Sequence, residues 1–160
     1  IKIKEKRTIL EPWLTEQSIS LVSGWRGVGK TFFCMGLCDA ITRGQSFGPW
    51  ECNTPVPCVY VEAEMPFPDV KERIFGLNPG QNRKVPLYIY PDAYASELGL
   101  PRANLLSERW REKMKAIFIA RGIKLWVADN LASLTRALTR TQRGTGIPST
   151  NGYLNSDLQV

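Results

Sequence analysis

Polar and apolar residues alternate along residues 18–23, a pattern typical of a short strand, and this segment leads directly into Gly24. Apolar residues then recur at helical spacing over residues 30–43, and Gly44 provides the expected left-handed stop. The pattern therefore predicts a strand, a glycine-rich turn and a helix in direct succession.

Two more strands and a short helix are predicted in the middle of the chain. Residues 57–62 form an apolar strand, and prolines then break the chain before a short helix over residues 69–75. Residues 77–82 have the composition of a turn. Residues 85–90 form the third strand, which we place near a sheet edge because Pro86 has no N–H for a strand ladder.

A capped helix and an apolar strand are the last regular elements that the pattern predicts. Ser107 is placed to cap a helix that runs to Arg121 and is closed by Gly122. Residues 123–128 then form a strand that ends at Asp129. Residues 135–160 are rich in Thr, Arg, Gly and Asn and show no clear strand or helix pattern.

This alternation of strands and helices predicts an α/β fold around a parallel sheet with right-handed crossovers. Ligands of such sheets bind beyond the carboxyl ends of the strands, where Gly24, Glu64 and Asp129 fall. A length of 160 residues is that of one domain. We therefore expect a single domain over residues 1–160, with residues 1–17 as an N-terminal extension and residues 135–160 as an irregular, incomplete C-terminal segment.

The residues from Gly24 to Thr31 match the Walker A pattern completely, although a glycine-rich turn without a ligand is the alternative. The glycines let backbone N–H groups turn inward around phosphate oxygens, and the following helix directs its positive end toward them. Lys30 is expected to reach the β- and γ-phosphates of ATP, and the Thr31 hydroxyl to bind Mg²⁺. The predicted nucleotide-binding residues are Gly24, Trp25, Arg26, Gly27, Val28, Gly29, Lys30, Thr31 and Phe32.

Three acidic residues are candidates for the metal site and for the catalytic base. Asp129 ends an apolar strand and is predicted to serve the Mg²⁺ together with Thr31. Asn130 follows where many P-loop ATPases carry a catalytic glutamate, and an amide cannot take a proton from water. We choose Glu64 as the base, because its strand is expected to lie beside the strand that enters the phosphate loop. Glu62 points to the same side and is the competitor, and two surface carboxylates are the third possibility.

The composition limits the chemistry further. The chain has no histidine, which excludes an imidazole base or a His-bound metal for these residues. The four cysteines fit free buried thiols better than a metal quartet, because their spacing is not that of a zinc knuckle. A net charge of +6 fits a nucleic-acid partner or a solvated basic surface, since the basic residues are spread along the chain.

The sequence gives no sign of a membrane segment. No apolar stretch approaches the ~18–20 residues of a membrane span, and the N-terminus lacks the apolar run of a signal peptide. We therefore expect a cytoplasmic location and no membrane partner.

Four segments together resemble bacterial RecA-like ATPases of the RepA plasmid-helicase type. They are residues 12–14, 27–31, 60–66 and 129–134, and the similarity covers most of residues 8–134. The resemblance implies a three-layer P-loop NTPase sandwich with a mainly parallel RecA-like sheet, and ATP with Mg²⁺ as cofactors. It further implies a ring-forming, often hexameric ATPase that acts on DNA in plasmids, phages or integrated elements. A glutamate matching Glu64 activates water in that family.

The chain departs from this family after Leu134. The family continues with a strand that ends in a histidine sensor and then an Arg-Gly-Ser/Thr segment, whereas this chain reaches Arg143-Gly144-Thr145 within a few residues. Either the sensor is lost or an internal segment is absent, so DNA-coupled hydrolysis does not follow from the resemblance alone. Arg143 is expected to act in trans on the ATP of a neighbouring subunit, and a solvated arginine is the alternative.

Three functions compete at this point. The leading one is a RecA-like ATPase motor that works on single-stranded DNA as a homo-oligomer, with Lys30, Glu64 and Arg143 as its catalytic residues. A small-molecule kinase would use the same phosphate loop, and a regulatory module would bind ATP without turnover. The Asn-Lys-x-Asp motif of GTPases is not present in the sequence.

Overall fold

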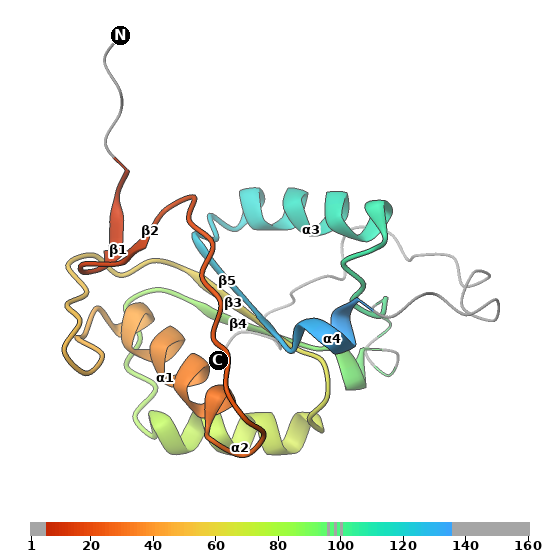
Figure 1. Cartoon of the computed structure of the whole chain (residues 1–160), viewed down its shortest axis with the longest axis horizontal. Helices are drawn as coiled ribbons and strands as arrows, with labels where there is room; N and C mark the ends of the chain where they lie inside the picture. The colour runs from red at the N-terminus through yellow and green to blue at the C-terminus, as the bar shows by residue number, and fades with distance from the viewer. Residues whose placement is uncertain (1–5, 96, 98, 100, 136–160) are drawn as a thin grey trace, which may run out of the picture.

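The computed structural model describes residues 6–95, 97, 99 and 101–135, and the structural statements below concern these residues. Strands and helices alternate from the phosphate loop onward, as the sequence predicts (Figure 1). The elements in chain order are β1 (Thr8–Leu10), β2 (Leu14–Thr15), α1 (Lys30–Arg43), β3 (Cys58–Glu62), α2 (Phe67–Leu77), β4 (Leu87–Pro91), the 3₁₀ helix η1 (Asp92–Tyr94), α3 (Glu108–Ala120), β5 (Leu125–Asp129) and α4 (Leu131–Leu134).

Three parallel strands form the main sheet, in the order β4-β3-β5. The central strand β3 is buried along its whole length, because β4 and β5 cover its edges and helices cover its faces. The register pairs Glu62, the last residue of β3, with Asp129, the last residue of β5. The carboxyl ends of these two strands therefore bring their acidic residues to the same edge of the sheet.

Helices lie on both faces of the sheet, with α1 and α2 on one face and α3 on the other (Figure 1). The core is divided accordingly. One apolar cluster contains Met35 and Ile41 of α1 with Tyr60 of β3, and the other contains Trp110 and Met114 of α3. None of the described helices is long and apolar enough to cross a membrane. The α/β class with a parallel sheet is confirmed, and the complete three-layer sandwich stays a prediction.

Several element boundaries agree with the local sequence signals. Helix α1 has the predicted bounds, and Gly44 ends it with a φ of 65°, where a side chain is disfavoured. The Ser107 hydroxyl accepts a hydrogen bond from the backbone N–H of Trp110 at 3.3 Å and so caps α3. Strand β4 lies at a sheet edge, as the adjacent Pro86 predicts.

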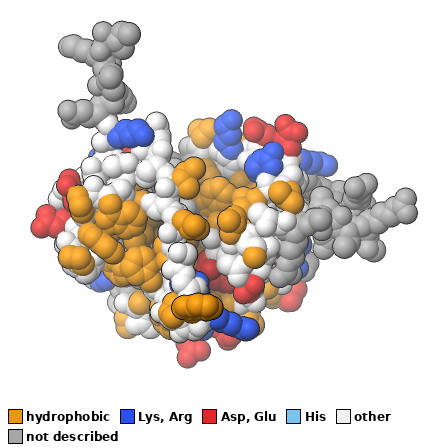
Figure 2. All heavy atoms as spheres, in the orientation of Figure 1, with side chains coloured by type: hydrophobic (Ala, Val, Ile, Leu, Met, Phe, Trp, Pro, Cys, Tyr) orange, Lys and Arg blue, Asp and Glu red, His pale blue; other side chains and the backbone are white. Residues whose placement is uncertain are grey.

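The predicted strand over residues 18–23 is wrong, because this segment has no regular secondary structure. Ile19 is 100% exposed and Leu21 is 80% exposed, and Figure 2 shows hydrophobic side chains on the surface where this segment runs. The expectation that the segment lies beside the second strand also fails, since β4 and β5 occupy both edges of β3. Alternation alone does not make a strand, because the backbone needs a partner for its hydrogen bonds.

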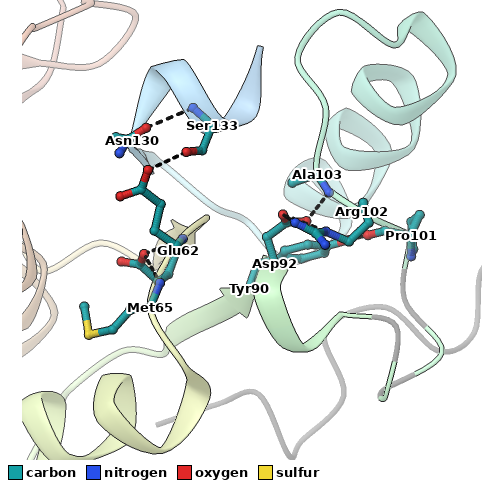
Figure 3. A network of polar contacts seen from close by, with 10 residues as sticks. Glu62, Met65, Tyr90, Asp92, Pro101, Arg102, Ala103, Asn130 and Ser133 are labelled. Carbon is teal, nitrogen blue, oxygen red and sulfur yellow. Dashed lines mark hydrogen bonds and ion pairs between the residues drawn. The ribbon is translucent and has the colours of Figure 1, made fainter. Parts of the chain in front are cut away.

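Two features outside the main sheet are not predicted by the sequence pattern. Strands β1 and β2 form a small antiparallel pair, and the N–H of Glu11 donates to the carbonyl of Glu51 at 2.8 Å. After β4, the Asp92 carboxylate forms an ion pair with Arg102 at 2.8 Å and accepts a hydrogen bond from the backbone N–H of Ala103 (Figure 3). These contacts join the start of η1 to residues 102 and 103.

The four cysteines are free thiols, as the sequence predicts. Cys38 and Cys58 are buried, and Cys34 and Cys52 are partly buried. Burial raises the pKa of the Cys34 thiol to about 12. This thiol is therefore protonated at neutral pH and packs as a small apolar group.

Candidate active site

The phosphate loop lies between the irregular segment that follows β2 and the first turn of α1. Gly27 and Gly29 have φ angles of 84° and 90°, in the left-handed region that side chains rarely adopt. Gly29 is the N-cap residue of α1, and its carbonyl accepts a hydrogen bond from the N–H of Phe33 at 2.9 Å. The two glycines thus allow the sharp turn that leads the chain into the positive end of a helix.

Lys30, the first residue of α1, folds back over the loop. Its Nζ donates hydrogen bonds to the carbonyl oxygens of Gly24 and Trp25, both at 2.9 Å. The ammonium charge is therefore held against the loop by two neutral acceptors. Phosphate oxygens would be stronger acceptors for this charge, because charge-assisted hydrogen bonds exceed those to neutral carbonyls.

Phe32 stands half-exposed beside the loop, where the guanidinium of Arg73 lies 4.8 Å from its ring centroid. A groove of about 530 Å³ opens here between the start of α1 and the helix α2, and it is lined by Phe32, Asp69, Glu72, Arg73, Gly76 and Leu77. Trp25 and Val28 are exposed on the loop itself. Of the predicted nucleotide-binding residues, 24–29 and 32 are exposed, whereas Lys30 and Thr31 are partly buried.

A hydrogen bond joins the two motifs that were assigned to the metal. The Thr31 hydroxyl donates to Oδ2 of Asp129 at 2.8 Å, across a separation of 98 residues in the chain. Thr31 comes from the first turn of α1, and Asp129 from the carboxyl end of β5. Packing of α1 against the sheet thus brings together a hydroxyl and a carboxylate, and the oxygen atoms of both groups can bind a metal ion.

Tyr60 is a third member of this cluster, and sequence reasoning missed it. Its hydroxyl donates to the same Asp129 oxygen at 2.5 Å. Burial and the hydrogen bond to Asp129 raise the pKa of Tyr60 well above its ordinary value, so the group remains a donor at neutral pH. The sequence holds no signal for this contact, because a tyrosine within an apolar strand has the pattern of a core residue.

Glu62 is the last residue of β3. It is buried, and its Oε1 accepts hydrogen bonds from the backbone N–H groups of Glu64 and Met65, both at 2.9 Å (Figure 3). Its Oε2 is buried with no hydrogen-bond partner among the described residues. Burial raises the pKa of Glu62, and the charges of Asp129 and Glu64 raise it further, while the two backbone bonds oppose this. Glu62 therefore shapes the turn after β3.

Glu64 lies on that turn with its side chain exposed to solvent. One carboxylate oxygen, Oε1, accepts a hydrogen bond from the Ser133 hydroxyl of α4 at 2.6 Å. The turn is tied to the neighbouring strand, since the N–H of Ala63 donates to the carbonyl of Asp129 at 2.8 Å. Glu64 is thus placed beside the carboxyl end of β5, and not beside a strand that enters the phosphate loop.

Asn130 has a structural task at the position where many P-loop ATPases carry a glutamate. Its Oδ1 accepts a hydrogen bond from the backbone N–H of Ser133 at 2.9 Å and so caps α4. The structure therefore brings Lys30 and Thr31 to one end of α1, and Glu64 and Asp129 to the facing edge of the sheet. Arg143 lies outside the described residues.

The sheet edge, the phosphate loop and the paired Thr31 and Asp129 define the class of the molecule as a P-loop-like α/β domain. Comparison with protein families agrees, because the family described as AAA domain (AAA_25) matches residues 2–147. The chain therefore belongs to this AAA domain family. Membership of this family indicates an ATPase-type function. No protein of curated function and no solved structure matched the chain.

Proposed function

We propose that the domain binds ATP with Mg²⁺ and hydrolyses it to ADP and phosphate. The observation that carries this proposal is the 2.8 Å hydrogen bond between the Thr31 hydroxyl and the Asp129 carboxylate. This bond joins the helix that follows the glycine-rich turn to a carboxylate from a distant strand. This contact supports the assignment of the two residues as Walker A and Walker B partners that share one ion.

The residues present fit Mg²⁺ by their chemistry. A hydroxyl and a carboxylate are hard oxygen ligands, which this ion prefers. The described residues contain no group of three His, Cys, Asp or Glu side chains that could hold a metal. This fits an ion that is held by few protein groups and by the phosphates of its nucleotide. Thr31 and Asp129 would hold it, and the ion would supply charge neutralisation on the phosphates.

The residues of the site divide the work of hydrolysis. Lys30 exchanges its two loop carbonyls for phosphate oxygens and stabilises the charge that develops on them. Glu64 accepts a proton from water while the water oxygen bonds to the γ-phosphorus. The bond from that phosphorus to the oxygen shared with the β-phosphate breaks, which leaves ADP and phosphate. Glu64 suits this role because its side chain is exposed to water and its Oε1 accepts a hydrogen bond from the Ser133 hydroxyl.

We propose single-stranded DNA as the polymer on which this ATPase works, in a helicase or replication ATPase of a plasmid, phage or integrated element. The resemblance to RepA-type ATPases supports this choice, and a net charge of +6 favours a polyanionic partner. The active form would be a homo-oligomeric ring, because hydrolysis in such a ring is completed by a residue from the neighbouring subunit.

The substitution Glu64→Gln tests the proposed chemistry. An amide cannot take the proton, so we expect ATP binding to persist while kcat falls by about 10²-fold or more. The measurement pairs calorimetric titration of Mg²⁺ATP with a steady-state assay of phosphate release.

Glu62→Gln is the matched control, because Glu62 sits two residues earlier and has its Oε1 occupied by backbone N–H groups. This variant should keep most of the turnover. The opposite pattern, with Glu64→Gln active and Glu62→Gln inactive, would exchange the two roles. Normal turnover in both variants would remove the general-base assignment from this turn.

Single-stranded DNA should increase the ATPase rate and bind with little sequence preference. Contacts of basic groups with phosphates do not depend on base identity, and they weaken as salt rises. We expect binding of a fluorescent oligothymidine at low ionic strength and its loss at high ionic strength. Turnover without any DNA binding at low salt would favour a small-molecule kinase or another substrate.

We propose that Arg143 reaches the γ-phosphate of a neighbouring subunit's ATP. A planar, permanently charged guanidinium stabilises charge on the transferring phosphoryl group, and the following Gly144 and Thr145 resemble the family's Arg-Gly-Ser/Thr segment. We expect Lys30→Ala and Arg143→Ala to be inactive separately and to recover part of the activity when mixed. Mixed rings contain interfaces where both residues are intact. Full activity of Arg143→Ala alone, or no recovery despite subunit exchange, would reject this role.

A further inference from the structure

Glu64 makes a side-chain contact with Ser133 that the proposed chemistry does not by itself require. Its Oε1 accepts a hydrogen bond from Oγ of Ser133 at 2.6 Å, although the glutamate side chain is exposed. An exposed glutamate samples many rotamers, and holding it in one rotamer costs side-chain entropy. A contact that selects one rotamer in advance removes that cost from the reaction step.

Ser133 is itself held on several sides. It is buried within the short helix α4, where its backbone N–H donates to Oδ1 of Asn130 at 2.9 Å (Figure 3). The adjacent Leu134 is fully buried, and its carbonyl accepts a hydrogen bond from the N–H of Leu105 at 2.8 Å. The hydroxyl of Ser133 therefore projects from a fixed piece of backbone.

A series of contacts leads from the end of β5 to Glu64. Asp129 ends β5, and the next residue, Asn130, caps α4 and fixes Ser133, which in turn contacts Glu64. These contacts connect the end of β5 to the carboxylate on the turn after β3. This links the position of the base to that of Asp129.

We infer that Ser133 is a positioning residue that holds Glu64 in the orientation in which its carboxylate receives the proton of the attacking water. The inference rests on the proposed function, because it needs Glu64 to be the base. Ser133 contacts neither substrate nor reacting atoms in this role, and it acts through Glu64 alone.

The test is a double-mutant cycle on ATP hydrolysis with Ser133→Ala and Glu64→Gln. Alanine removes only the hydroxyl and keeps the backbone N–H that Asn130 caps, so α4 should persist. We expect Ser133→Ala to lower kcat on the order of tenfold, as for one hydrogen bond to a charged group, with KM for ATP unchanged. In the Glu64→Gln background the same substitution should have no further effect on the residual rate.

Ser107→Ala is the matched control, because it also removes a serine hydroxyl from a helix N-terminus, where this hydroxyl accepts a hydrogen bond from the Trp110 N–H and caps α3. This variant should lower thermal stability and leave kcat unchanged. The inference is overturned if Ser133→Ala leaves kcat at the wild-type value, or if it slows the Glu64→Gln variant as much as it slows the wild type. If Glu64→Gln itself hydrolyses ATP normally, the proposed function fails first.

Discussion

The hydrogen bond from the Thr31 hydroxyl to the Asp129 carboxylate joins the first turn of α1 to the carboxyl end of β5. The hydroxyl of Tyr60 in the central strand β3 donates to the same oxygen. The Asp129 carboxylate therefore connects its own strand β5 with α1 and β3. Other interactions also hold these elements in place. Helix α1 packs its apolar side chains on one face of the sheet, and β5 pairs with β3. The packing of these elements brings the hydroxyl of Thr31 and the carboxylate of Asp129 together next to the phosphate loop.

The two glutamates at the carboxyl end of β3 and on the turn that follows illustrate how burial separates roles between residues of the same type. Glu62 is buried, and backbone N–H groups occupy one of its oxygens, so it stabilises the turn. Glu64 is exposed to water, and its Oε1 accepts a hydrogen bond from the Ser133 hydroxyl, which orients the carboxylate without removing it from solvent. A residue that takes a proton from water needs both access and orientation, and Glu64 is the one that combines them.

Much of the fold follows from short-range signals in the sequence. Ser107, Gly44 and Pro86 each set a boundary or an edge through their own backbone and side-chain chemistry, and the structure agrees with them. Residues 18–23 show the limit of such signals, because a strand requires a partner and alternation does not specify one.

The candidate site was predictable to the same extent. The phosphate loop and Asp129 follow from local pattern, and the pairing of Thr31 with Asp129 follows from their assigned roles. The contacts of Tyr60 and Ser133 join residues 69 positions apart in each case, and no local pattern encodes them. The asparagine after β5 was a usable signal for a helix cap, which would have placed α4 but not its contact with Glu64.

The central claim is that Thr31 and Asp129 form a site for the Mg²⁺ of a bound nucleotide. Calorimetric titration of ATP with and without Mg²⁺ tests it most directly, with wild type compared with Asp129→Asn. Asparagine keeps the size of the side chain and an oxygen that can accept from Thr31, but it removes the charge. Wild type should bind ATP more tightly with Mg²⁺ than without it. In the variant, which should remain folded, this increase in ATP affinity should be smaller by about 10- to 100-fold. An unchanged Mg²⁺ dependence in folded Asp129→Asn would contradict the account.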